Sequence, residues 1–409
     1  MKNSGIPWIG EIPEGWKVEN IKSIYTERNE RSINGSETLL SLSQYTGVKP
    51  KAETEIADSH IAETYEGYKI VSKGDFVMNI MLAWNGSYAV SNYDGMISPA
   101  YCVFKFRDDK HHKRYYHYLL RTEGYPSAFK TLSRGIMDSR LRLYPEQFYT
   151  FPTILPPLSE QQAIADFLDK KCAEIDQMVA LQEKFIEELK AYKQSLITET
   201  VTKGLNTNAP MKDSGVEGIG EVPEGWDVIL LPFVFRNLDY LREPISAEQR
   251  SRKNPIYDYY GASGIIDKID FYNVDDDVLL IGEDGANLRM RNLPLIYRAT
   301  GKFWVNNHAH ILKPIKDNIN FMQYMLEALD YNDFITGSAQ PKLSQDNLAK
   351  VRVCVPPLPE QQAIADFLDK KCAEIDQLIA VKQKKADELK EYKKSIIYEY
   401  VTGKRSVCE

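Results

Sequence analysis

Two segments of the chain share one helical pattern of apolar and polar residues. In residues 156–204 and 356–409 the apolar side chains recur alternately four and three positions apart. This spacing is typical of a coiled-coil seam. Each segment is long enough for a helix of about 43 residues, or roughly 65 Å. The seam positions are Ala165, Leu168, Cys172, Ile175, Val179, Ile186, Leu189 and Leu196, and then Ala365, Leu368, Cys372, Ile375, Ile379, Ala386, Leu389 and Ile396.

Helices of this length would extend past most single domains, so we expect the two to pack on each other. The alternative is that each helix packs on its own domain. Local signals mark the ends: Ser159 with Gln162 fits a capping box at the start of the first helix, and Gly204 and Gly403 are natural helix stops.

The remaining residues, 1–155 and 205–355, form two modules rich in tyrosine, glycine, asparagine and β-branched residues. Short apolar runs bounded by turn residues predict strands, and two longer runs predict short helices. We therefore expect each module to be α+β with a twisted sheet. The strand runs begin at residues 69, 75, 101, 278 and 310, and the helices cover residues 115–120 and 321–329.

The chain repeats itself at a distance of 200 residues. The stretch EQQAIADFLDKKCAEIDQ occurs at residues 160–177 and again, unchanged, at 360–377, and a second repeat relates residues 3–16 to 213–226. Between these edges the two modules match poorly. Two copies of a domain explain the pattern better than a solenoid. An identical frame with divergent inserts is expected if the frame binds a constant partner while the inserts read different targets.

Chain length and net charge limit the classes of protein to which the sequence can belong. A chain of 409 residues predicts at least two domains. The formal net charge of −7 means that any DNA binding must come from clustered cations on loops. Neither a membrane span nor a signal peptide is recognisable, so a cytoplasmic protein is expected. The five cysteines lack the spacing of a zinc site or a disulfide framework.

The order of module, PPLxEQQ helix, module, PPLxEQQ helix resembles the specificity (S) subunit of type I restriction-modification systems over nearly the whole chain. Each module opens with the entry motif, GEIPEGW at 10–16 and GEVPEGW at 220–226. The second module also resembles the family in YYGASG (259–264), IGEDGAN (281–287), GKFWVNNHAH (301–310) and GSAQPKL (337–343). The first resembles another subfamily in GDFVMN (74–79), WNG (84–86), ISPAY (97–101) and SRGIMDSR (133–140).

The resemblance implies an α+β fold with two target recognition domains, joined and spaced by two long antiparallel coiled-coil helices with pseudo-twofold symmetry. The implied domains are 1–155 and 205–355, with spacer helices at 156–204 and 356–409. Each domain would read one half of a bipartite DNA sequence. The partners implied are double-stranded DNA, two methyltransferase (M) subunits and restriction/translocase (R) subunits. S-adenosylmethionine, ATP and Mg²⁺ would then be cofactors of those subunits, with none in this chain.

Base reading requires polar side chains presented on rigid loops. Gln340 can hold adenine, Lys342 can take guanine or a phosphate, and Arg134, Asp138, Ser139 and Arg140 occupy the corresponding place in the first module. The other DNA-binding candidates are Gln44, Tyr45, Asn79, Trp84, Asn85, Tyr259, Tyr260, Ser263, Asn287, Asn307 and His308. The candidates for partner docking and helix pairing are Gln161, Gln162, Phe167, Leu168 and Ile175, with Gln361, Gln362, Phe367, Leu368 and Ile375.

Two other classes of function stay open at this point. One is an autonomous Mg²⁺-dependent nuclease built around Glu283, Asp284, His308 and His310, because paired carboxylates bind Mg²⁺. Against it, the chain lacks a PD-(D/E)xK pattern, an HNH-like cluster, a Walker loop and methyltransferase motifs. A metal at His308 and His310 would need a third ligand that the sequence does not reveal. The other class is a coiled-coil scaffold that touches no DNA.

Overall fold

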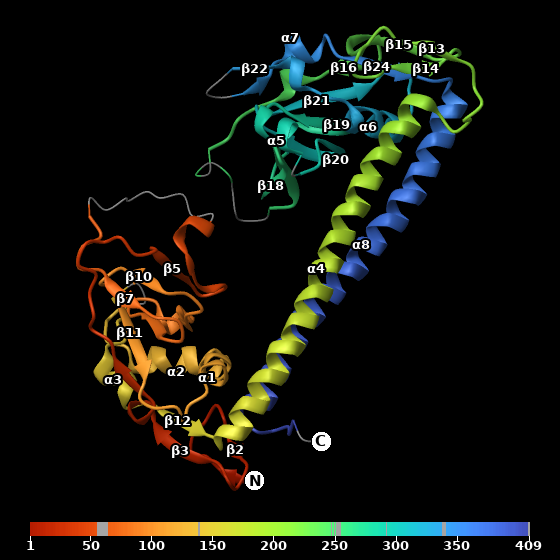
Figure 1. The fold of residues 1–409 in the computed structure, drawn as a ribbon. Helices are drawn as coiled ribbons and strands as arrows, with labels where there is room; N and C mark the ends of the chain where they lie inside the picture. Colours follow the sequence, from red (N-terminus) through yellow and green to blue (C-terminus); the bar gives the residue numbers. More distant parts are fainter. Residues whose placement is uncertain are drawn as a thin grey trace. The chain divides into compact units, whose positions relative to one another are not determined.

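The computed structural model describes residues 1–54, 64–137, 140–246, 248, 250, 255–291, 293–337 and 341–407. The chain divides into two compact units (Figure 1). Unit 1 consists of residues 1–182 and 384–409, and unit 2 consists of residues 183–383. Each unit therefore contains one module, part of its own long helix and part of the other. The linear domain bounds given above stay a prediction.

Unit 1 is built around a four-stranded antiparallel sheet in the order β4-β11-β8-β9. Two-stranded ladders surround it, and three short helices pack against it. The strands are β1 (Lys2–Asn3), β2 (Glu11–Ile12), β3 (Lys17–Asn20), β4 (Tyr25–Glu27), β5 (Leu40–Ser43), β6 (Gly47–Pro50), β7 (Lys69–Val71), β8 (Phe76–Asn79), β9 (Tyr88–Val90), β10 (Gly95–Ile97), β11 (Tyr101–Phe106) and β12 (Pro152–Leu155). The helices are α1 (Lys113–Leu120), α2 (Gly124–Leu132) and α3 (Pro145–Tyr149).

Unit 2 is built around a six-stranded mixed sheet in the order β16-β21-β19-β20-β17-β18, in which β17 and β20 run parallel. The strands are β13 (Met211–Asp213), β14 (Glu221–Pro223), β15 (Asp227–Leu230), β16 (Phe235–Asn237), β17 (Tyr257–Gly261), β18 (Gly264–Ile269), β19 (Val274–Gly282), β20 (Ile296–Val305), β21 (Ala309–Pro314), β22 (Ile335–Thr336), β23 (Lys342–Leu343) and β24 (Arg352–Val355). The helices are α5 (Gly285–Met290), α6 (Ile319–Ala328) and α7 (Gln345–Leu348).

The two long helices are α4 (Leu158–Lys203) and α8 (Leu358–Val401). Each follows a Pro-Pro pair, so α4 begins one residue before Ser159, and the cap predicted there is wrong: Ser159 lies within the first turn. The predicted stop at Gly204 is confirmed, because this glycine follows α4 directly with a φ of 74°. A left-handed glycine of this kind ends a helix at little cost.

Within each unit, parts of α4 and α8 run antiparallel and side by side (Figure 1). In unit 1 Phe167 contacts Tyr400, with ring centroids 4.4 Å apart, and Lys393 pairs with Asp176 at 2.6 Å. In unit 2 Lys193 pairs with Asp376 at 2.7 Å. The predicted seam residues are mostly buried in these contacts and against the modules. Both packing arrangements considered from the sequence therefore occur together.

Hydrogen bonds at equivalent positions attach each long helix to its module in the two units. The buried Trp16 indole N–H donates to Glu160 at 2.7 Å, and Trp226 donates to Glu360 at 3.0 Å. One face of the short helix α1 or α6 also packs on the long helix. The Tyr118 hydroxyl donates to Asp169 in unit 1, and Tyr324 donates to Asp369 in unit 2. The repeated sequence therefore codes for a repeated frame.

The cores differ between the units. That of unit 1 is rich in aromatic residues, with Phe76 stacked on Phe148 at 5.5 Å beside Tyr25 and Phe104. That of unit 2 is mainly aliphatic and includes Leu279 and Ile281 of the six-stranded sheet. One frame thus carries two different sheets. Among the described residues, no helix has the length and apolar content needed to cross a bilayer.

Candidate nucleic-acid interface

In unit 1 the predicted DNA-binding residues belong to three turns. Tyr45 lies in the turn between β5 and β6 and is 83% exposed. Arg134 and Arg140 lie in the segment after α2, and both are exposed. The backbone of Arg134 pairs with that of Arg142, and the Leu143 N–H donates to the Ile80 carbonyl at 2.9 Å. This pairing fixes the arginine-bearing loop to the end of β8.

A further turn, at residues 79–86, contacts the arginine-bearing loop through the Ile80 carbonyl. The Trp84 indole donates to the Met81 carbonyl at 3.0 Å, and Lys130 of α2 lies 5.2 Å from the centre of its ring. The Asn85 carboxamide accepts from the Ser87 hydroxyl. Arg121 donates to the Gln44 carbonyl at 2.5 Å, which ties the β5–β6 turn to the body of the unit. These contacts hold the turns in fixed positions.

In unit 2 the structure gathers several predicted residues around Glu283. The Glu283 carboxylate lies 3.2 Å from Arg242 and 3.5 Å from Lys342. Its backbone N–H donates to the His308 carbonyl, and its carbonyl accepts from Leu343 N–H. The exposed Asn307 and the half-exposed His308 therefore lie at the same edge of the sheet as Lys342. Sequence reasoning missed Arg242, which has no motif around it.

A buried pair supports this edge. His310 Nδ1 lies 2.6 Å from Asp239, and its Nε2 lies 2.8 Å from the Leu343 carbonyl. Both ring nitrogens therefore face oxygen atoms, one of a carboxylate and one of a backbone carbonyl. Burial raises the pKa of Asp239, but the hydrogen bonds from His310 and the Ile311 N–H, together with the charges of His310 and Arg242, outweigh it and hold that pKa below its usual value. His310 is thus a structural residue beneath the loop.

The nuclease reading finds no support at this edge. Two cations already neutralise Glu283, and the closest approach of His308 to Asp284 is 3.8 Å. Within the described ranges, no group of three or more histidine, cysteine, aspartate or glutamate side chains is placed to hold a metal ion. Mg²⁺ sites are built from convergent oxygen ligands. The carboxylates here form ion pairs instead.

Three predicted contacts, Asn79, Tyr259 and Tyr260, are buried, and a fourth, Asn287, is partly exposed but bonded to the backbone. Asn79 accepts from the Met81 N–H, and the Tyr259 hydroxyl contacts the Ile245 backbone. Tyr260 is buried in the sheet, and Asn287 bonds the backbone of residues 293 and 294. Their role in this structure is to hold the fold. The predicted contact Ser263 is exposed in the β17–β18 turn. The predicted contacts Asp138, Ser139 and Gln340 lie outside the described residues.

Most of the predicted docking residues on the helices are buried within their units. Gln161 and Gln361 are buried, and their carboxamides bond the modules. Leu168, Ile175, Leu368 and Ile375 are core residues, and Phe167 and Phe367 are half-buried against the cores. Only Gln162 and Gln362 are exposed. Buried side chains cannot form a surface for a partner, so their role is to hold each unit together.

Six of the exposed apolar residues of the helices lie at three pairs of equivalent repeat positions and make up two matched sets. We call Met178, Leu181 and Tyr392 of unit 1 and their equivalents Leu378, Val381 and Tyr192 of unit 2 the apolar sets. Each member is between about two fifths and two thirds exposed. Each unit takes two members from one long helix and one from the other. The signal was visible in the sequence, because these residues lie off the seam.

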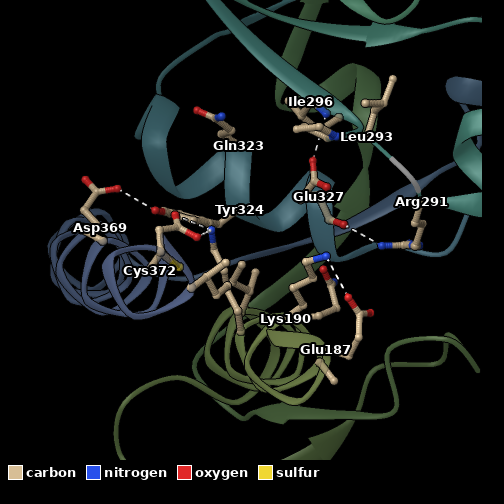
Figure 2. Close-up of a pocket in the computed structure, with 18 residues that line it drawn as sticks. Glu187, Lys190, Arg291, Leu293, Ile296, Gln323, Tyr324, Glu327, Asp369 and Cys372 are labelled. Carbon is tan, nitrogen blue, oxygen red and sulfur yellow. Dashed lines mark hydrogen bonds and ion pairs between the residues drawn. The ribbon is translucent and has the colours of Figure 1, made fainter. Parts of the chain in front are cut away.

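Unit 2 also has a groove of about 980 Å³ between α6, α4 and α8 (Figure 2). The charged side chains that line the groove form ion pairs with one another or hydrogen bonds with the backbone. Glu327 accepts from the Leu295 and Ile296 N–H groups, and Arg291 donates to the Glu327 carbonyl at 3.1 Å. Lys190 pairs with Glu187. Burial raises the pKa of Glu327. The groove is therefore a joint between module and helices.

Comparison with known proteins identifies the class. The model of the type I restriction modification DNA specificity domain matches residues 13–191 and 237–391. The MjaVIII specificity subunit of a type I restriction enzyme from Methanocaldococcus jannaschii is 25% identical, with 96% of this chain and 93% of that protein covered. The putative MjaX specificity subunit from the same organism is 26% identical, with 97% and 95% covered.

Solved structures agree on the fold. A chain from a study of complex assembly and conformational transition of the type I R-M system has a TM-score of 0.73 at 16% identity, with 96% of this chain and 98% of that chain covered. The HsdS subunit from Thermoanaerobacter tengcongensis has a TM-score of 0.52 at 16% identity, with 97% and 98% covered.

The fold and the surface loops therefore define a non-catalytic DNA-specificity subunit with two recognition modules on a repeated helical frame. The chain belongs to the type I restriction modification DNA specificity family. Catalysis in this family lies in the partner subunits.

Proposed function

We propose that residues 1–155 and 205–355 each read one half of a bipartite double-stranded DNA sequence. The spacer helices, residues 156–204 and 356–409, would then set the length of the unread spacer. The observation that carries this proposal is one frame holding two different sheets. The repeated joints, such as Trp16 to Glu160 and Trp226 to Glu360, keep the frame constant. The loops that the frame presents differ in sequence and structure, as two different half-sites require.

In unit 1 the proposed reading residues are Arg134 and Arg140 of the loop after α2, together with Gln44 and Tyr45 of the β5–β6 turn. Neither arginine is paired with a carboxylate in the part of the chain that the structure describes, so both guanidinium groups can bind guanine or phosphate. In unit 2 the proposed residues are Lys342, Asn307, His308 and Ser263, and Gln340 stays a candidate by sequence. Glu283 positions the lysine.

A substitution in one domain should then affect one half of the target. Arg134→Ala should weaken binding to DNA that carries the first half-site about tenfold, and Lys342→Ala should do the same for the second. The assay is competition binding by the assembled complex, with duplexes in which one half is scrambled. Lys17→Ala is the control, because Lys17 is an exposed residue of the frame strand β3. Equal loss on both half-scrambled duplexes would contradict the assignment.

We further propose that each apolar set docks one methyltransferase subunit, so that two copies bind. The sets have the same composition of aliphatic and tyrosine side chains at equivalent repeat positions, which is what two copies of one partner require. Restriction/translocase subunits would join this assembly in the cytoplasm. S-adenosylmethionine, ATP and Mg²⁺ would be bound by those partners.

Native mass spectrometry tests the docking proposal. A variant with Met178→Glu and Leu181→Glu should retain one methyltransferase, and one with Leu378→Glu and Val381→Glu should retain the other. Combining all four changes should leave none. Lys184→Glu, at an exposed position of α4, is the control. Two bound methyltransferases on every variant would contradict docking at the apolar sets.

A further inference from the structure

The arginine-bearing loop of unit 1 also presents apolar side chains to solvent. Ile136 is 101% exposed and Met137 is 57% exposed, and one glycine, Gly135, separates them from Arg134. Single exposed apolar residues are ordinary on protein surfaces. Two adjacent ones at the tip of a loop are a different feature. Ile136 buries none of its side chain in its own unit and Met137 buries less than half, so the pair adds little packing to the fold.

The loop has a defined backbone where it carries these side chains. Gly135 has a φ of 150°, and a Cβ at this position would come within 2.5 Å of the Arg140 carbonyl oxygen. The backbone pairing of Arg134 with Arg142 closes the base of the loop. A glycine is thus required for the close approach, and Ile136 is held outward between two exposed arginines.

The turn next to this loop also exposes apolar side chains. The Leu143 N–H donates to the Ile80 carbonyl, and the two residues after Ile80, Met81 and Leu82, are exposed as well. Apolar side chains therefore occur on both turns that meet at the end of β8. The exposed Arg134 and Arg140 lie on the same loop as Ile136, which fits a polyanion whose surface also carries apolar groups.

In the major groove of DNA the apolar group on a base edge is the 5-methyl of thymine. We infer that Ile136 reads the 5-methyl group of a thymine in the half-site of recognition domain 1. The inference rests on the proposed function, because it requires this loop to lie in the groove. Arg134 would supply the charge that holds the loop there, and Ile136 would supply discrimination between thymine and a base without the methyl group.

Deoxyuridine tests the inference, since it removes only the methyl group. Each thymine of the mapped target is replaced in turn, and affinity is measured for the complex with methyltransferase. At one thymine of the first half-site, deoxyuridine should weaken binding about fourfold, the effect of losing one buried methyl group. Ile136→Ser should weaken binding to the natural duplex by at least as much and should abolish the response to deoxyuridine.

Ile33→Ser is the matched control, because Ile33 is 86% exposed in unit 1 but lies outside the three turns. It should leave affinity and the deoxyuridine response unchanged. An unaltered deoxyuridine response in Ile136→Ser, or no response at any thymine, would overturn the inference. If the Arg134→Ala variant binds both half-sites as tightly as wild type does, the loop does not lie on DNA, and the proposed reading of DNA by this domain fails as well. If Arg134→Ala weakens binding but Ile136→Ser does not, only the proposed methyl contact fails.

Discussion

Replacing Gln161 with leucine should destabilise unit 1 strongly, although the residue lies on a long helix in a segment that looks like a docking surface. Gln161 is 0% exposed. Its Oε1 accepts from the His112 N–H at 2.8 Å, and its Nε2 donates to the Pro156 and Lys110 carbonyls at 2.8 and 3.3 Å. The carboxamide thus joins the start of α4 to the start of α1.

The size of the effect follows from these bonds. Leucine has a similar volume but leaves the His112 N–H and the Pro156 carbonyl without their partner. Each buried polar group that loses its hydrogen bond costs about 1–3 kcal/mol. We therefore expect a loss of about 2–6 kcal/mol in the free energy of unfolding of unit 1. The neighbour Gln162 is exposed and bonds only Asp166, so Gln162→Leu should change stability by less than about 0.5 kcal/mol.

Hydrogen exchange with mass spectrometry on the full chain separates the two units. In Gln161→Leu, peptides from α1 should exchange at least tenfold faster, and peptides from α6 in unit 2 should not change. In Gln361→Leu, peptides from α6 should exchange faster and peptides from α1 should not change, because Gln361 makes the equivalent bonds to Asn318 and Pro356. If Gln161→Leu is as stable as Gln162→Leu but loses methyltransferase, the residue is a docking residue and the reasoning is refuted.

Three further predictions concern charge. Burial lowers the pKa of His117 to about 3, so below pH 6.5 the unfolded chain binds a proton that folded unit 1 does not; stability should fall by about 1 kcal/mol from pH 7.5 to 5.5, and urea titrations of His117→Gln should lack this part of the slope. His310→Ala removes the 2.6 Å partner of the buried Asp239 carboxylate and leaves it the Ile311 N–H and the longer Arg242 contact at 3.4 Å. The free energy of unfolding of unit 2, measured by thermal unfolding, should therefore fall by about 1–3 kcal/mol. Lys193→Ala and Lys393→Ala remove exposed ion pairs and should each cost under about 1 kcal/mol in the same assay, with a smaller difference in high salt.

The long helices and several of the strands could be predicted from the sequence. Heptad spacing and Pro-Pro boundaries are local signals, and so is the apolar run of residues 101–106, which form β11. The strand orders could not be predicted, because pairings such as parallel β17 with β20 join residues that no local pattern relates. The start of α4 was misjudged by one residue, since the Pro-Pro pair dominates over the serine signal.

The site was predicted less well, for a physical reason. Motif residues such as Asn79 and Tyr259 serve the fold as often as the ligand, and only burial separates the two roles. Gln161 shows the same ambiguity on the helix. Arg242 was missed because its contact with Glu283 spans 41 residues. The apolar sets could have been found by marking the apolar residues that lie outside the seam.

The central claim is that each recognition domain reads one half of a split sequence. The most direct test is to express this chain with its methyltransferase in a methylation-free host and to map N6-methyladenine across the genome. The account predicts one motif of two short halves around a fixed spacer, in which replacing residues 205–355 by the corresponding domain of a relative changes one half and leaves the other. A motif that changes in both halves, or methylation without any motif, would contradict it.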